Sequence, residues 1–142
     1  MASIDPTSRD RAGRTPLHYA VSVDKDFELA RRLIDAGADV NARDDAGMTP
    51  LHFAAQYPDI VTGVDILLRA GADPNAVDNR NRGPLIHALG STLSAGIAKL
   101  LLEAGSDPYH VDDNNYSPAL YVERYVADDI KEVFEPYLRP PK

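Results

Sequence analysis

The sequence predicts an all-α solenoid of four stacked helix-loop-helix units joined by β-hairpin-like fingers. The hexapeptide "TPLHYA" at 15–20 returns as "TPLHFA" at 49–54, 34 residues later. The segment "AGADVNA" at 36–42 returns at the same interval as "AGADPNA" at 70–76 and "AGSDPYH" at 104–110. A unit of this length cannot bury its apolar face alone. A fixed interval therefore indicates repeats that stack on one another.

The interval divides the chain into four repeats, at about 10–43, 44–77, 78–111 and 112–138. They form one repeat domain over 10–138, between an N-terminal extension at 1–9 and a C-terminal tail at 139–142. Arg32 of the first repeat stands where the middle repeats have Ile66 and Leu100. A polar residue at this position suits an outward-facing cap, which predicts a complete, monomeric stack.

Each repeat predicts a first helix that begins at a proline. Proline fits the first turn of a helix because its missing N–H has no partner there, and Ser or Thr just before it suits the N-cap. Thr15, Thr49 and Ser117 stand at that position. The prolines are Pro16, Pro50, Pro84 and Pro118.

A second helix and a finger follow in each repeat. Polar segments at 24–26, 58–59 and 94–96 predict the loops between the paired helices. Gly37, Gly71 and Gly105 suit the left-handed position after the second helix. The Asp-, Asn- and Gly-rich segments after them predict the fingers. Positions of positive φ are expected in these fingers at Gly13, Gly47, Asn81 and Asn115.

Composition narrows the classes of function. A hydrophobic content of 44% and a charged content of 26% are typical of a globular protein. No secretory signal, membrane-spanning run or cysteine is present, so we expect a cytoplasmic protein without a membrane partner. The net charge of −7 disfavours nucleic acid as a partner, because phosphate contacts need a cationic stripe. Seven aspartates that recur at the repeat interval contribute much of this charge.

The segments "DRAGRTPLHYA", "DDAGMTPLHFAA" and "LLRAGADPNA" resemble ankyrin repeats, which carry a Thr-Pro-Leu-His-x-Ala signature near the first helix. The family period is about 33 residues. The extra residue here is expected in the loop between the helices. Ile86 and Leu120 depart from the signature, because they stand where His18 and His52 stand. The resemblance implies protein binding on a concave face formed by the finger tips and the first helices.

The histidines are the obvious catalytic or metal-binding candidates, and the sequence argues against both roles. The resemblance implies that His18 and His52 bond the first helix to neighbouring loops. Equivalent helices pack about 8–10 Å apart, whereas zinc–nitrogen bonds are about 2.0 Å long. His87 and His110 have no partner ligand three or four residues away. The segment "GSTLSAG" at 90–96 lacks the lysine of a phosphate loop and predicts an interhelical loop. We therefore expect no catalytic residue, metal or cofactor.

The candidate partner-binding residues follow the concave face in columns at the repeat interval. One column runs along the first helices, a second lies one turn further on, and a third runs along the fingers. Tyr and Arg are the types that most often anchor interfaces, so Tyr57, Arg82, Tyr116 and Tyr125 are the expected central anchors. The full set is Arg14, Tyr19, Asp45, Met48, Phe53, Tyr57, Arg80, Arg82, His87, Asp113, Tyr116, Tyr121 and Tyr125.

The leading interpretation is a non-enzymatic binding module that occupies a partner protein and inhibits or regulates it. The resemblance to small stand-alone bacterial ankyrin proteins adds one specific form, an immunity protein that neutralises a toxin. The alternative within the same class is a eukaryotic-type adaptor, scaffold or regulatory inhibitor. The alternative from a different class is an enzyme that uses the repeat histidines.

Overall fold

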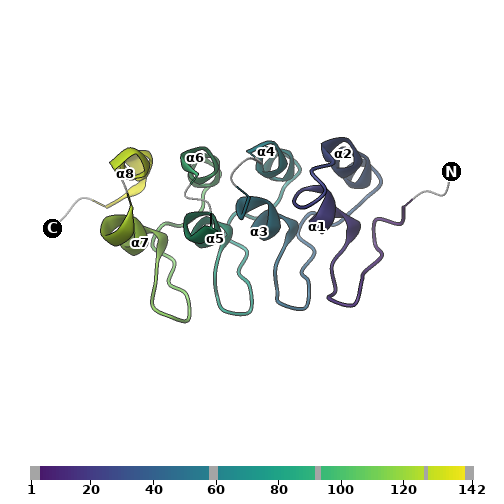
Figure 1. Cartoon of the computed structure of the whole chain (residues 1–142), viewed down its shortest axis with the longest axis horizontal. Helices are drawn as coiled ribbons and strands as arrows, with labels where there is room; N and C mark the ends of the chain where they lie inside the picture. Colours follow the sequence, from purple (N-terminus) through teal and green to yellow (C-terminus); the bar gives the residue numbers. More distant parts are fainter. Residues whose placement is uncertain (1–3, 58–60, 92–93, 127, 140–142) are drawn as a thin grey trace.

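The computed structural model describes residues 4–57, 61–91, 94–126 and 128–139. Four helix pairs stack along one axis in chain order, as Figure 1 shows. The described residues contain helices and turns and no strand, so the predicted all-α solenoid is confirmed. The first helices are α1 (Pro16–Ala20), α3 (Pro50–Ala55), α5 (Pro84–Ser91) and α7 (Pro118–Tyr125). The second helices are α2 (Phe27–Asp35), α4 (Val61–Arg69), α6 (Ala95–Glu103) and α8 (Asp128–Phe134), with a 3-10 turn at Glu135–Tyr137.

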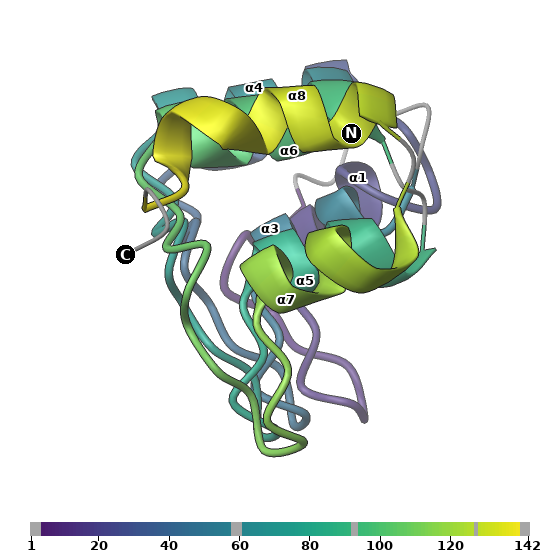
Figure 2. The same ribbon diagram turned by 90° about the vertical axis from the view of Figure 1, so that its left-hand side faces the viewer.

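The two kinds of helix form two layers. Figure 2 looks along the stack and shows the second helices in one layer, the first helices in the other, and the fingers projecting from them. Leucines of the first helices, such as Leu17 and Leu51, are fully buried between the layers. Leu67 and Leu101 of the second helices are fully buried as well. Each repeat therefore shares one continuous apolar core with its neighbours.

The first helices begin where the sequence predicts. Each opens on its proline. The Thr49 hydroxyl accepts the His52 N–H at 3.4 Å, and the Ser117 hydroxyl accepts the Leu120 N–H at 3.2 Å. These side chains satisfy backbone donors that a helix leaves free at its start.

In the third repeat, part of the segment predicted as the loop between the paired helices is helical. Ser94 is the N-cap of α6, and its hydroxyl accepts the Ile97 N–H at 3.3 Å. Ala95 and Gly96 therefore lie in the first turn of α6, which corrects the prediction of a loop at 94–96. Helix α5 also continues through Ser91. Residues 58–60 and 92–93, on which part of the loop prediction falls, lie outside the described residues.

The predicted turn residues have the expected backbone. The glycine two positions after the second helix has a φ of +97° at Gly37, +96° at Gly71 and +102° at Gly105. At the finger tips the positive-φ residues are Gly13, Gly47, Asn81 and Asn115. Asparagine replaces glycine in the last two repeats because it is the other residue type that tolerates this region well.

Each finger closes on itself through one aspartate. The Asp44 N–H donates to the Met48 carbonyl at 2.9 Å, and Asp44 Oδ1 accepts the N–H groups of Ala46 and Met48. The same bonds recur at Asp10, Asp78 and Asp112. This closure makes the fingers hairpin-like although no strand is assigned to them.

The repeat pattern extends into the segment predicted as an N-terminal extension. Asp5 Oδ1 accepts the Thr7 N–H at 2.8 Å, as Asp39 accepts the Asn41 N–H at 2.9 Å one interval later. Arg9 donates to the carbonyls of Gly13 and Arg43, and Arg43 repeats this with Gly47 and Val77. Contacts characteristic of the repeat are therefore present from Asp5 onward.

Candidate functional site

His18 and His52 join each of the first two repeats to the finger of the next. His52 Nδ1 accepts the Thr49 N–H at 3.0 Å, and its Nε2 lies 2.9 Å from the Arg82 carbonyl oxygen. Because Nδ1 is an acceptor, the proton is on Nε2, which donates to that carbonyl. His18 makes the same bonds with Thr15 and Met48.

Both rings are held in the neutral form. Burial lowers the pKa of His18, and it lowers the pKa of His52 to about 4, against the effect of the bond to the Arg82 carbonyl. Both nitrogens of each ring are occupied by the framework. These bonds show that His18 and His52 have the structural role that the resemblance implied, which is to join the first helix to a neighbouring finger.

The third repeat has a different polar cluster. Ile86 has replaced the framework histidine, and His87, one position later, is 8% exposed. His87 Nε2 donates to Asp78 Oδ2 at 2.9 Å, and the Gln56 side-chain amide donates to His87 Nδ1 at 3.0 Å. Burial raises the pKa of Asp78, but hydrogen bonds from Arg82, His87 and the Arg80 N–H outweigh it and lower that pKa to about 2.

An open hollow of about 540 Å³ lies on the concave face between the third and fourth repeats. We call it the aromatic hollow. The ring centroids of Tyr121 and Tyr125 are 5.3 Å apart in it, and a hydrogen bond with the Tyr125 side chain raises the pKa of Tyr116. Tyr125 is 58% exposed, so its ring is available to a partner. The lining residues are Arg82, Ile86, His87, Gly90, Asp112, Asn114, Tyr116, Tyr121 and Tyr125.

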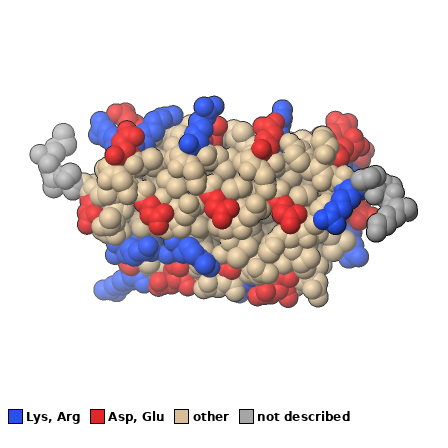
Figure 3. All heavy atoms as spheres, turned by 180° about the vertical axis from the view of Figure 1, so that it is seen from behind, with Lys and Arg blue, Asp and Glu red and all other residues tan. Residues whose placement is uncertain are grey.

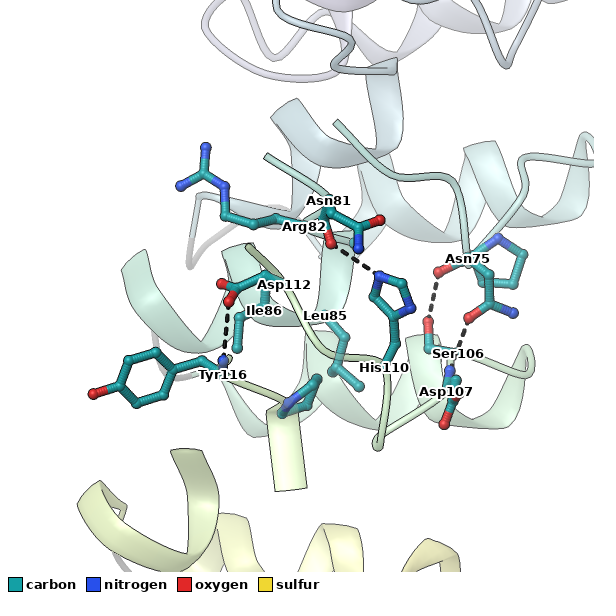
Figure 4. Close-up of a pocket in the computed structure, with 13 residues that line it drawn as sticks. Asn75, Asn81, Arg82, Leu85, Ile86, Ser106, Asp107, His110, Asp112 and Tyr116 are labelled. Atoms are coloured by element: carbon teal, nitrogen blue, oxygen red, sulfur yellow. Dashed lines mark hydrogen bonds between the residues drawn. The ribbon is translucent and has the colours of Figure 1, made fainter. Parts of the chain in front are cut away.

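A narrower cavity of about 200 Å³ adjoins it between the bases of the same two fingers (Figure 4). His110 reaches into this region and bonds through Nε2 to the Asn81 carbonyl at 2.9 Å. The earlier repeats have Ala42 and Ala76 at this position. His110 was not among the predicted site residues, although its departure from alanine in the repeat alignment is a signal that could have found it.

The repeat sequence matches a known family over most of the chain. A family model described as ankyrin repeats (3 copies) matches residues 2–78 and also residues 23–112. The protein belongs to the ankyrin repeat family. No curated protein matches the sequence. Ankyrin repeats are modules for protein–protein interaction, and this chain is such a module. The family is generally not enzymatic.

The candidate partner-binding residues of this ankyrin repeat protein do not form one surface but fall into three groups. The aromatic hollow brings together five of them, Arg82, His87, Tyr116, Tyr121 and Tyr125. Asp45, Arg80 and Asp113 are exposed on the fingers. The remaining five are partly buried outside the hollow: Arg14, Tyr19, Met48, Phe53 and Tyr57.

In the first two repeats, candidate side chains make contacts within the stack. The Arg14 guanidinium carbon lies 5.0 Å from the centre of the Phe53 ring, and Arg14 Nε lies 3.5 Å from Asp44 Oδ2. The Tyr19 hydroxyl donates to Asp10. These contacts occupy the concave face of the ankyrin stack near its N-terminal end and leave less of it open to a partner.

The acidic charge of the ankyrin stack follows the repeat. Asp39, Asp73 and Asp107 are exposed at equivalent positions. Figure 3 shows acidic side chains at even intervals across the face turned away from the viewer of Figure 1. An even spacing along the scaffold does not define a binding site.

Among the described residues, no group of three or more His, Asp or Glu side chains could hold a metal ion. In the same ranges, no helix has both the length and the apolar character that crossing a bilayer requires.

Proposed function

We propose that the protein binds a partner protein on the concave face of its third and fourth repeats and inhibits or regulates that partner by occupying it. The observation that carries this proposal is the aromatic hollow, where three tyrosines and Arg82 line one open depression. Tyrosine and arginine are enriched among the residues that dominate binding energy. A tyrosine that is 58% exposed, Tyr125, stands at the hollow.

Variation between repeats supports the same surface. Scaffold positions keep similar residues from copy to copy, as Leu33, Leu67 and Leu101 do in the first three repeats. The positions equivalent to Tyr125 hold Val23, Tyr57 and Ser91. A surface position that the scaffold does not constrain is free to be selected for one partner. We therefore retain Arg82, Tyr116 and Tyr125 as the proposed central anchors, and Tyr57, in the second repeat and outside the hollow, as a weaker one.

The specific role that we favour is inhibition, with an immunity protein that neutralises a toxin as one form. We also propose that the protein acts as a cytoplasmic monomer and binds neither nucleic acid nor membrane. A compact binding surface on a small chain suits the blocking of one partner. An adaptor or scaffold, the alternative, has to hold two partners at once and so needs a second surface. Assay of the captured partner with increasing amounts of the protein separates the two roles, because an inhibitor abolishes activity at a stoichiometric amount.

Affinity capture tests the proposed surface directly. The full chain is immobilised as wild type, as Tyr125→Ala and as Lys99→Ala, and retained proteins are identified by mass spectrometry. Lys99 is exposed on α6, away from the first helices, and serves as the control. We expect a partner that wild type and Lys99→Ala retain and Tyr125→Ala loses. A partner retained equally by all three would place the binding site elsewhere.

A further inference from the structure

The four finger aspartates share one design. Oδ1 of each accepts backbone N–H groups of its own finger, which leaves Oδ2 for a side chain. In the first three repeats a side chain from the concave face takes Oδ2. Tyr19 donates to Asp10, and Arg14 reaches Asp44 Oδ2 at 3.5 Å. Asp78 Oδ2 accepts from Arg82 at 3.1 Å and from His87 at 2.9 Å.

The fourth repeat leaves this oxygen free. Asp112 is only 9% exposed, and its Oδ1 accepts the N–H groups of Asn114 and Tyr116 at 2.9 Å each. No side chain within the described ranges reaches Asp112 Oδ2. Asp112 lines the aromatic hollow. No buried side-chain oxygen of the described residues lacks a hydrogen-bond partner, so Asp112 Oδ2, which has none, reaches solvent at the hollow and can accept from a donor outside the chain.

A contact elsewhere in the stack indicates which chemical group could bind Asp112 Oδ2. Arg14 lies between the Asp44 carboxylate and the Phe53 ring, at 3.5 Å from Oδ2 and 5.0 Å from the ring centre. Two repeats further on, Asp112 and Tyr121 stand at the positions of Asp44 and Phe53. The Arg14–Asp44–Phe53 contact is therefore a template for an arginine between Asp112 and Tyr121.

Arg82, which stands at the position of Arg14, does not fill this place. It pairs with Asp78 of its own repeat at 3.0 Å, and in Figure 4 its side chain turns away from Asp112. By the pattern of Arg14 and Asp44, Asp78 would pair with the residue at position 48 of the preceding repeat. That residue is Met48, which carries no charge, so Asp78 pairs with Arg82 instead. Because Met48 stands where the first repeat has Arg14, Arg82 pairs with Asp78, and no arginine of the described residues lies between Asp112 and Tyr121.

We propose that Asp112, with the rings of Tyr121 and Tyr125, receives an arginine side chain of the partner protein. This inference rests on the proposed docking at the aromatic hollow and specifies its chemistry. A guanidinium stacks on an aromatic ring and bonds to a carboxylate in one plane, whereas the ammonium of lysine is a compact point charge. Asp78 balances the charge of Arg82, so the charge of Asp112 is left for the incoming group. Arg80, whose carbonyl accepts the Asp113 N–H at 3.1 Å, and Arg124 are both exposed, and neither makes an ion pair with Asp112 in the described part of the chain.

An NMR titration of the full chain with N-acetyl-arginine amide tests the site without the partner. The lysine and glutamine analogues serve as separate arms. We expect the arginine probe to bind in the millimolar range and to shift the signals of Asp112, Tyr116, Tyr121 and Tyr125. Asp112→Asn keeps the Oδ1 acceptor that closes the finger and removes the charge, so it should bind the probe about tenfold more weakly. Asp35→Asn, at an exposed position on α2, removes the same charge and should leave binding unchanged.

Three results would overturn the inference. The first is an absence of shifts at these four residues, and the second is equal binding by wild type and Asp112→Asn. The third is equal binding of the arginine and lysine probes, which would show a cation site without preference for arginine. None of these results bears on partner capture. Loss of the partner in Tyr125→Ala together with full retention in Asp112→Asn would uphold the proposed function and refute the arginine site.

Discussion

At His52, a single imidazole ring connects the start of one helix to the finger of the next repeat. It accepts from the Thr49 N–H and donates to the Arg82 carbonyl, and the first of these contacts requires the neutral ring, because a protonated Nδ1 cannot accept. The His87 ring, with its centroid 5.2 Å away, the Asp78 carboxylate and Arg43 also affect its protonation. Removing one partner of such a bond leaves a buried polar group unsatisfied. We expect His52→Gln to lower the free energy of unfolding by about 1–3 kcal/mol at pH 7, measured by urea denaturation.

The stability of the protein should fall as the pH drops below about 6.5. His52 has a pKa of about 4 in the folded chain and 6.5 without the fold, so the unfolded chain binds more protons between these values. Stability is therefore fully present above pH 6.5 and is lost as the pH falls toward 4. For His52 alone, the loss between pH 7 and 5.5 is about 1 kcal/mol.

Urea denaturation of wild type and His52→Gln at the two pH values isolates this contribution. The variant should show a smaller loss by about 1 kcal/mol, and burial of His18 and His87 accounts for part of what remains. An identical loss in both proteins would show that His52 is not held neutral by the fold.

The sequence allowed some residue-scale features to be predicted and not others. The turn residues Gly47 and Asn81 were predictable because their position in the repeat demands a positive φ. The contrast between Asp112 and the other finger aspartates was not predictable. All four look alike in the alignment, and the difference depends on which of two aspartates Arg82 pairs with. The nearly buried state of His87 was missed because its column holds aromatic residues in the other repeats.

At the scale of the helix, two glycines should respond in opposite ways to the same substitution. Gly71 follows α4 with a φ of +96°, where any side chain strains the backbone. Gly90 lies inside α5, and an added Cβ would meet nothing within 4 Å. Thermal denaturation should show Gly71→Ala less stable by about 1–2 kcal/mol and Gly90→Ala no less stable than wild type. A loss in both variants would contradict the assigned backbone of Gly90.

The packing of the second helices gives a further prediction. Leu67 on α4 and Leu101 on α6 are fully buried at equivalent positions. Leu67→Ala and Leu101→Ala each remove volume from the core that neighbouring repeats share. Each should lower the free energy of unfolding by about 2–5 kcal/mol in urea denaturation. Wild-type stability in both variants would refute the repeat register.

Helix starts were easier to predict than the loops before them. Proline with a preceding Ser or Thr locates the first helix of a repeat because few other positions accept proline without cost. Ser94-Ala95-Gly96 suggested a loop from its small residues, but Ser94 is a cap and the next two residues begin α6. Composition alone did not distinguish the end of a loop from the first turn of a helix.

At the scale of the whole molecule, the interval of 34 residues determines the architecture. Each repeat contacts its neighbours, so the stack was predictable from periodicity once the four copies were in register. The aromatic hollow was predictable only in part. The tyrosines were visible as exceptions within columns, but their gathering with Arg82 around one depression depends on the local packing of two repeats.

The central claim is that the aromatic hollow is the partner-binding surface. The most direct measurement is a calorimetric titration of the captured partner with wild type, Tyr57→Ala, Tyr125→Ala and the control Lys99→Ala. The claim predicts that Tyr125→Ala weakens binding by at least about 2 kcal/mol, roughly thirtyfold, while its stability changes by less than about 0.5 kcal/mol. Tyr57→Ala should weaken binding less, because Tyr57 lies outside the hollow, and Lys99→Ala should bind as wild type does. Equal affinity of Tyr125→Ala and wild type, with both folded, would contradict the claim.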